Sequence, residues 1–245
     1  MVGTLDTSDG STGLLIVSGG NEVRVGAHRG MASLAARLAA GGTPVFRYDR
    51  RGIGDSSGEN RGFLESAPDI AAAAATFAAE TGIRRMVAFG NCDAATALAF
   101  FHGVAGIDSL VLANPWVVES GGDLPPAAAI RARYAERLRD PRTLGRLLRG
   151  GINLRKLSSG LSKVFAEKSE ADTALTERFI AALDGSATPA TIILASRDAT
   201  ALAFMDAIKA VKINADIHRL DTGSHSFARE PDQAALESIV RGVIA

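Results

Sequence analysis

The sequence predicts an α/β fold in which a mostly parallel sheet carries helices on both faces. Short apolar runs of strand length alternate with longer helical patterns along most of the 245 residues. The short runs are apolar throughout, as expected for strands that are buried on both faces. Alanine is abundant and aromatic residues make up only 5% of the chain, which suits helices that pack closely on a sheet.

Each expected element has its own local signal. Runs rich in β-branched or aromatic residues predict strands at 14–18, 44–49, 85–89, 109–114, 190–195 and 215–220. Apolar residues at helical spacing, mostly bounded by Gly, Asp or Ser, predict helices at 29–40, 67–81, 93–103, 201–211 and 231–243.

The alternation of strands and helices stops between residues 119 and 186. This stretch contains no convincing strand, but Ile130, Tyr134 and Leu138 follow a helical spacing. A helical insertion between two strands at the top of a sheet is the usual construction of a lid. We therefore expect a core domain of residues 1–118 and 187–245, with a helical cap at 119–186.

Composition excludes several classes of protein. Lys and Arg (27) balance Asp and Glu (27), which argues against a general nucleic-acid binder. A single cysteine with scattered histidines excludes an internal disulfide and a structural zinc site, and we expect no metal. The N-terminus lacks the pattern of a signal peptide, and the richest apolar stretch, 70–79, is shorter than the ~20 residues of a membrane span. We expect a soluble cytoplasmic protein with no integral membrane segment.

The one cysteine, Cys92, lies directly between a predicted strand and a predicted helix. A free cysteine is often just a small buried apolar residue. Here, however, Gly90 and Ala94 place small residues two before and two after it, which is the spacing of a nucleophile elbow, where larger side chains would collide. A helix N-terminus also favours the thiolate, the reactive form of a group whose ordinary pKa is about 8.5. The pattern therefore predicts that Cys92 is a nucleophile.

A thiolate nucleophile needs an imidazole partner, and the chain has four histidines. His102 falls near the far end of the helix after Cys92, and His218 falls within a strand, where we expect it to pack. His28 opens a helix near the first strand and is a candidate for the site. His225 is the best candidate because it follows the last strand, at the carboxyl edge where α/β sheets place their chemistry.

The imidazole in turn needs a carboxylate to hold its working tautomer, and a carbonyl substrate needs donors for its developing oxyanion. Asp198 follows the strand before His225 and meets the first need. The backbone N–H of Asp93, at the start of a helix, is expected to be one oxyanion donor. The second is expected from the loop after the first long strand, with Asn21 preferred over Gly20.

These residues together resemble the α/β-hydrolase superfamily over nearly the whole chain. The order Cys92, Asp198, His225 is that family's order of nucleophile, acid and base. The resemblance is closer to exosortase A system-associated hydrolases of the first type, on the Gly-x-Cys-Asp-Ala elbow and on Asn-Pro-Trp-Val at 114–117. It implies an α/β-hydrolase fold and an association with bacterial exopolysaccharide gene clusters. The family's first strand is expected to be absent or shortened to 1–6.

The side chain of Asp93 departs from the family pattern because it puts an anion beside the nucleophile. It is expected to cap the helix or to pair with a cation, for which Arg24, Arg29 and Arg51 are the candidates. Trp116 is expected either to line an acyl pocket or to pack in the core. His28 and Arg24 are further candidates for that substrate pocket.

The expected cap carries the regional charge. Residues 131–156 include nine Lys or Arg and two acids, a net charge of +7. Such a stretch is either a solvated helical face or a surface that attracts an anionic substrate, an acidic partner or a membrane surface.

The sequence therefore predicts hydrolysis of a carboxylic ester or thioester through an acyl-enzyme on Cys92, without a cofactor. The expected substrate is a small-molecule or carrier-linked acyl group, which is anionic if the cap is a binding surface. Two alternatives remain open. One is an acyltransferase that uses the same three residues, for example in exopolysaccharide modification, and the other is a non-catalytic binding protein on a hydrolase scaffold. The oligomeric state does not follow from the sequence.

Overall fold

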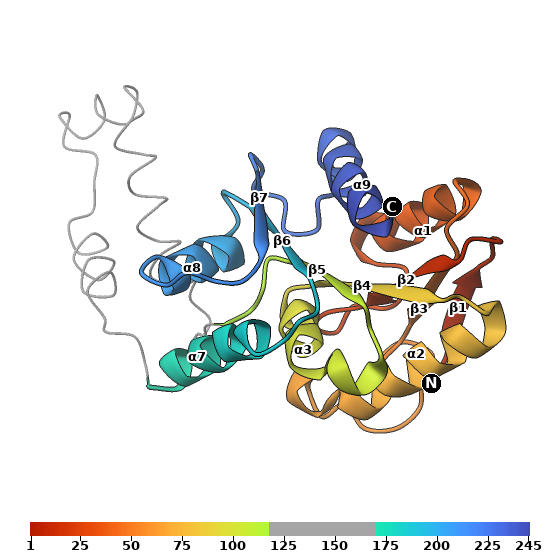
Figure 1. Ribbon diagram of the computed structural model, residues 1–245, viewed down its shortest axis with the longest axis horizontal. Helices are drawn as coiled ribbons and strands as arrows, with labels where there is room; N and C mark the ends of the chain where they lie inside the picture. The colour runs from red at the N-terminus through yellow and green to blue at the C-terminus, as the bar shows by residue number, and fades with distance from the viewer. Residues whose placement is uncertain (118–169) are drawn as a thin grey trace, which may run out of the picture.

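The computed structural model describes residues 1–117 and 170–245, which form a seven-stranded sheet between two layers of helices (Figure 1). Its order is β1-β3-β2-β4-β5-β6-β7, and only β1 runs antiparallel to its neighbour. The strands are β1 (Gly3–Asp6), β2 (Thr12–Val17), β3 (Val45–Tyr48), β4 (Arg85–Asn91), β5 (Ser109–Ala113), β6 (Ala190–Ala195) and β7 (Asp216–Leu220).

Helices cover both faces of this sheet. One layer contains α1 (Gly30–Ala40) and α9 (Glu230–Ile244), whose apolar residues pack in one core cluster. The opposite layer contains α2 (Ala67–Thr81), α3 (Asp93–Phe101), α7 (Glu170–Asp184) and α8 (Ala199–Ile208), which pack in the second cluster. In Figure 1 the two layers lie above and below the strands.

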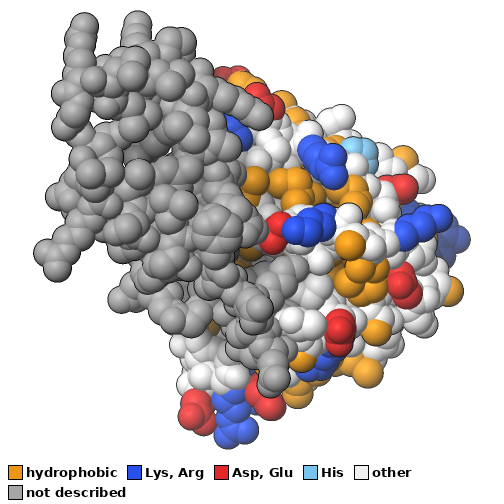
Figure 2. All heavy atoms as spheres, turned by 90° about the vertical axis from the view of Figure 1, so that its left-hand side faces the viewer, with side chains coloured by type: hydrophobic (Ala, Val, Ile, Leu, Met, Phe, Trp, Pro, Cys, Tyr) orange, Lys and Arg blue, Asp and Glu red, His pale blue; other side chains and the backbone are white. Residues whose placement is uncertain are grey.

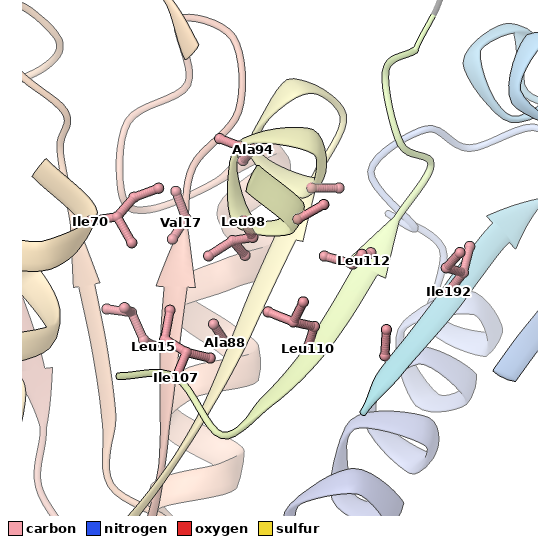
Figure 3. Packing of buried hydrophobic residues seen from close by; sticks show 14 of the residues in the cluster. Leu15, Val17, Ile70, Ala88, Ala94, Leu98, Ile107, Leu110, Leu112 and Ile192 are labelled. Carbon is pink, nitrogen blue, oxygen red and sulfur yellow. The ribbon is translucent and has the colours of Figure 1, made fainter. Parts of the chain in front are cut away.

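Residues that alternate along each central strand separate the two clusters. Leu15 and Val17 of β2 pack under α2 and α3, whereas Leu14 and Ile16 pack under α1 and α9, and all four are buried. Figure 3 shows the first cluster, in which strand side chains meet Leu98 of α3 and other helical residues. Both faces of a strand are therefore apolar, which explains why these strands read as continuous apolar runs.

The predicted fold class is confirmed, including the mostly parallel sheet with helices on both faces. All six expected strands are present, and the first strand is the short β1, as expected from residues 1–6. The expectation for His218 was wrong. Its strand β7 is the sheet's edge, paired only with β6, and His218 is exposed rather than packed.

Most of the expected cap lies outside the described residues, including the basic stretch 131–156. The last part of the 119–186 range contains α7, which packs against α3 and α8. Phe179 of α7 is fully buried and meets Phe204 edge to face at 5.6 Å. This helix is therefore part of the helical layer on the sheet.

The topology places the loops that follow the parallel strands at one edge of the sheet. In an α/β protein this carboxyl edge is where ligands bind. None of the helices in the described ranges is long and apolar enough to cross a membrane. On the face shown in Figure 2, basic and acidic side chains of the described residues are intermixed.

Candidate active site

Cys92 occupies a sharp turn between β4 and α3. Its backbone has φ 62° and ψ −127°, outside the regions that a non-glycine residue normally adopts. Its N–H donates to the carbonyl of Ala113 at the end of β5, 3.0 Å away, which holds the turn against the sheet. A strained backbone of this kind, kept by the surrounding structure, is typical of a functional site.

Gly90 lets the helix return so closely over the strand. A Cβ atom at this position would lie 2.8 Å from the carbonyl carbon and oxygen of Ala94 and 2.9 Å from the nitrogen of Ala95. Since these are backbone atoms, no side-chain movement would relieve the clash. The small residue two positions before Cys92 is thus a steric requirement of the turn.

His225 and Asp198 form a hydrogen-bonded pair at the same edge. His225 Nδ1 lies 3.0 Å from Asp198 Oδ2, so Nε2 is the ring nitrogen that remains for Cys92. Asp198 also accepts from the N–H groups of Thr200 and Ala201, because it is the N-cap of α8. The carboxylate is thus fixed by the helix before it meets the imidazole.

The electrostatics of the pair favour an imidazolium beside a carboxylate. Burial disfavours the charged ring, but hydrogen bonds to Asp198 and Cys92 and the negative charge of both partners raise the pKa of His225 to about 10. Burial alone would raise the pKa of Asp198, whereas the hydrogen bond and charge of His225 and two backbone N–H donors lower it below its ordinary value. The structure therefore brings Cys92, His225 and Asp198 together at this edge of the sheet, and their catalytic roles stay a prediction.

The carboxylate of Asp93 does not cap its own helix. It accepts a 2.6 Å hydrogen bond from the N–H of Gly20, and its other oxygen lies 3.6 Å from the guanidinium of Arg50. Arg50 is 5% exposed and also donates to the carbonyl of Gly20. The cation beside Asp93 is therefore Arg50, not Arg24, Arg29 or Arg51. The expectation of a helix cap was wrong because the Gly19–Gly20 loop approaches closely enough to supply the donor.

The cations proposed from the sequence have other roles. Arg24 binds Asp49 and Asp55. The hydrogen bond that its guanidinium donates to Asp55 is the largest effect and raises its pKa, as the contacts with Asp49 also do, while partial burial lowers it. Arg51 pairs with Asp69 at 2.5 Å. Arg24 is thus held in an ion-pair network with Asp49 and Asp55, and its place in a substrate pocket stays a prediction.

The remaining predicted residues differ in their exposure and in their hydrogen bonds. Trp116 is joined to it through the backbone, since its N–H donates to the carbonyl of Cys92 at 3.2 Å. Asn21 is exposed, its side-chain oxygen accepts from Asn60, and its backbone N–H makes no hydrogen bond to another described residue. His28 is exposed with φ 51° and has no hydrogen bond to the three candidate catalytic residues. His102 is buried and meets Ser186 Oγ at 2.8 Å, away from the site.

Two residues at this edge were not predicted from the sequence. Asn91 and Asn114, at the ends of β4 and β5, both donate to the backbone carbonyl of His225, at 3.1 and 3.0 Å. The signal that could have found Asn114 is a polar residue directly after an apolar strand. Within the described ranges, no group of three or more His, Cys, Asp and Glu side chains is placed to hold a metal ion.

Comparison with known proteins shows the family and the fold. Residues 14–237 match the model of the Alpha/beta hydrolase family. A search of the curated proteins finds no match.

Solved structures resemble the chain over nearly its whole length at low sequence identity. They include DcsB in complex with its substrate analogue (16% identity, 99% of this chain and 92% of that one, TM-score 0.64). The esterase Pf2001 of Pyrococcus furiosus has 15% identity over 98% of this chain and 84% of its own, with a TM-score of 0.58. XC6422 of Xanthomonas campestris, described as a serine hydrolase without a lid, has 14% identity over 99% and 88%, with a TM-score of 0.59. At such identities the likeness concerns the fold.

Proposed function

Because the chain belongs to the alpha/beta hydrolase family, we propose that it hydrolyses a carboxylic ester or thioester through an acyl-enzyme on Cys92. The observation that carries the proposal is the chain of hydrogen bonds from Asp198 through His225 to Cys92 at the elbow. A buried carboxylate that orients an imidazole, which in turn meets a nucleophile, is the arrangement that acyl transfer requires.

The proposed reaction has two stages. In the first, the sulfur of Cys92 attacks the carbonyl carbon, and His225 holds the thiol proton and passes it to the leaving alcohol or thiol as the bond to the acyl group breaks. In the second, His225 accepts a proton from water as the water oxygen attacks the thioester, and the carbon–sulfur bond breaks to release the acid and the Cys92 thiolate beside the imidazolium, which restores the starting state. Asp198 stays ionised throughout and keeps Nδ1 of His225 protonated.

The oxyanion of each stage needs two donors near Cys92. The N–H of Asp93 is the first in α3, where a backbone N–H has no acceptor within the helix. The N–H of Gly20 is already bound to the Asp93 carboxylate, whereas that of Asn21 has no such partner among the described residues. We therefore assign the second donor to Asn21.

The test is turnover of p-nitrophenyl esters and matching thioesters of graded acyl length, with mass spectrometry of acid-quenched protein. Since Cys92 is the only cysteine, an acyl adduct on a thiol has one location. We expect the adduct in the native protein and loss of both adduct and turnover in Cys92→Ala. Asp198→Asn should lower kcat by about 10⁴-fold, as loss of this tautomer control does in other triads. Asp216→Asn, the same change at an exposed position of β7, is the control and should match the native protein.

Turnover that persists in Cys92→Ala would overturn the proposal. Absence of adduct and turnover across the whole series, in folded native protein, would favour the binding-protein alternative. Adding an alcohol or amine acceptor tests the acyltransferase alternative, which predicts that the acyl group goes to the acceptor instead of water. The exosortase association and a separate cap domain stay predictions.

A further inference from the structure

We propose that Asn91 and Asn114 form an amide clamp that positions His225 through its backbone. The inference rests on the proposed function in that His225 is the base it positions. It goes further by assigning to two asparagines a role in the reaction, without contact with the substrate.

The clamp is a closed set of hydrogen bonds around one carbonyl. Nδ2 of Asn91 and Nδ2 of Asn114 both donate to the carbonyl oxygen of His225, and Nδ2 of Asn114 also donates to Oδ1 of Asn91 at 3.1 Å. Oδ1 of Asn114 accepts from the N–H of Ala195 at 2.8 Å. All the polar atoms of the Asn114 side chain are therefore used, which its complete burial requires.

The partners determine which way each amide points. A carbonyl oxygen only accepts and a backbone N–H only donates, so Nδ2 of Asn114 must face His225 and Oδ1 must face Ala195. No other side chain of this length offers an acceptor and two donors from one planar group. Asn114 also has φ 42°, a backbone region that asparagine enters more readily than most residues.

The clamp connects the three segments that carry the candidate catalytic residues. Asn91 directly precedes Cys92, and Ala195 is three residues before Asp198. The carbonyl that both amides bind belongs to His225 itself. Asp198 holds the ring at Nδ1, so the clamp supplies a second point of attachment at the main chain, and two points define the direction of the imidazole.

The rest of the His225 loop is held from the other side, by the chain leading into α9. Thr222 Oγ1 donates to Asp232, and Ser224 Oγ accepts from the N–H of Ala228. These bonds fix the loop to its own continuation. Within the described ranges, the side-chain hydrogen bonds that fix it to the ends of β4 and β5 are those of the two amides.

The experiment measures Asn91→Ala, Asn114→Ala and the double variant. The control is Asn214→Ala, which changes an exposed asparagine outside the clamp. Each protein is first checked for folding by thermal unfolding, and rates are normalised to folded protein. We expect kcat to fall about tenfold per amide lost, because a small misplacement of a catalytic group is costly, with KM changed less than about twofold. If Asn114→Ala does not fold, the half-buried Asn91 still provides the test.

A second measurement needs no substrate. Alkylation of Cys92 by iodoacetamide is followed from pH 5 to 10, since it reports the neighbouring imidazolium directly. In both clamp variants the profile should move toward that of His225→Gln, whereas the control should keep the native profile. A purely structural role would lower the melting temperature and leave the profile and the normalised kcat unchanged, which would overturn the inference. Turnover in Cys92→Ala would refute the proposed function alone, because the alkylation profile would still test the clamp.

Discussion

At the scale of single residues, the surroundings of Cys92 contain charges of both signs. The Asp93 carboxylate disfavours a second negative charge on the neighbouring sulfur, whereas Arg50 and the His225 imidazolium favour it. Arg50 lies 3.6 Å from Asp93 and is almost fully buried, so neither charge is well screened by water. Arg50 therefore neutralises the Asp93 carboxylate, which accepts the hydrogen bond that holds the Gly19–Gly20 loop.

Removing one member of this pair should be worse than removing both. Arg50→Gln leaves Asp93 without its cation and should lower the free energy of unfolding by about 3 kcal/mol, as for other buried pairs that lose one partner. It should also slow alkylation of Cys92 at pH 7. Adding Asp93→Asn should restore part of both losses. Urea unfolding of the native protein, the two single variants and the double variant gives the interaction energy between the two side chains. Additive effects in that cycle would show that the two side chains do not interact.

His225 leads to a pH prediction for the thiol. With its pKa raised to about 10, the ring remains a cation across neutral pH and loses its proton only near pH 10. Iodoacetamide should therefore alkylate native Cys92 about tenfold faster than it alkylates His225→Gln at pH 6 to 7, because the thiolate is the reactive form. Above pH 10 the two rates should converge. Equal rates at pH 6 would mean that the imidazole is not charged beside the sulfur.

The sequence alone could indicate Cys92, Asp198 and His225 as candidates, because each lies shortly after a recognisable strand and their order is informative. It could not identify Arg50 as the partner of Asp93. Arg50 and Arg51 are adjacent, and only the path of the loop after β3 turns one toward the elbow and the other toward Asp69. The amide clamp was missed for a similar reason, since it joins the ends of β4, β5 and β6 to the loop after β7, and these four segments are separated in sequence.

At the scale of elements, the crossing of β4 and α3 depends on the missing side chain of Gly90. The contacts around it are backbone atoms of the first turn of α3, so an added methyl group must separate the helix from the strand. The close crossing also determines where the N–H of Asp93 lies relative to Cys92.

Gly90→Ala should therefore lower the free energy of unfolding by about 2 kcal/mol or more, as overpacking does, and should lower kcat in the folded fraction. The matched control is Gly242→Ala in α9, where an added Cβ meets nothing within 4 Å. That change should stabilise by about 0.5 to 1 kcal/mol, the gain expected for alanine over glycine in a helix. Urea unfolding measures both, and equal effects would contradict the steric account.

Helix α7 shows what a periodic pattern can and cannot reveal. The helical spacing that predicted a cap lies at Ile130, Tyr134 and Leu138, outside α7. The place of α7 in the helical layer was not visible from the sequence, because nothing local distinguishes a cap helix from a core helix. Its position follows from tertiary packing: Phe179 and Leu183 are buried in the cluster that α3 and α8 share.

Phe179→Ala should test that packing. Loss of a fully buried phenylalanine should lower the free energy of unfolding by about 3 to 5 kcal/mol. Glu177→Ala, an exposed change in the same helix, should alter it by less than about 0.5 kcal/mol. Similar values for the two variants would show that α7 does not belong to the core.

At the scale of the whole molecule, the His225–Asp198 pair links stability to pH. The pKa of His225 is higher in the folded protein, about 10, than the value near 6.5 of an unfolded chain. Its contribution to stability is therefore complete below about pH 6.5 and is lost as the pH rises toward 10. Asp198 acts in the opposite direction: its lowered pKa contributes above about pH 4 and is lost in acid.

The free energy of unfolding of the native protein should thus decrease between pH 6.5 and 10 by more than that of His225→Gln. Urea titrations at intervals across this range measure the difference, and comparison with the variant removes the titration of all other groups. Parallel curves for the two proteins would show that folding does not change the proton affinity of His225.

Asp198 combines two duties that proteins usually divide. The oxygen that orients His225 also caps the N-terminus of α8, because it accepts from the N–H groups of Thr200 and Ala201. Catalytic groups commonly destabilise a fold, so that replacing them raises stability and lowers activity. At this position that exchange is limited, because Asp198 also caps α8 and only residues such as Asn and Ser cap a helix comparably. A library selected only for thermostability should therefore keep one of these capping residues at position 198, even with no demand for catalysis.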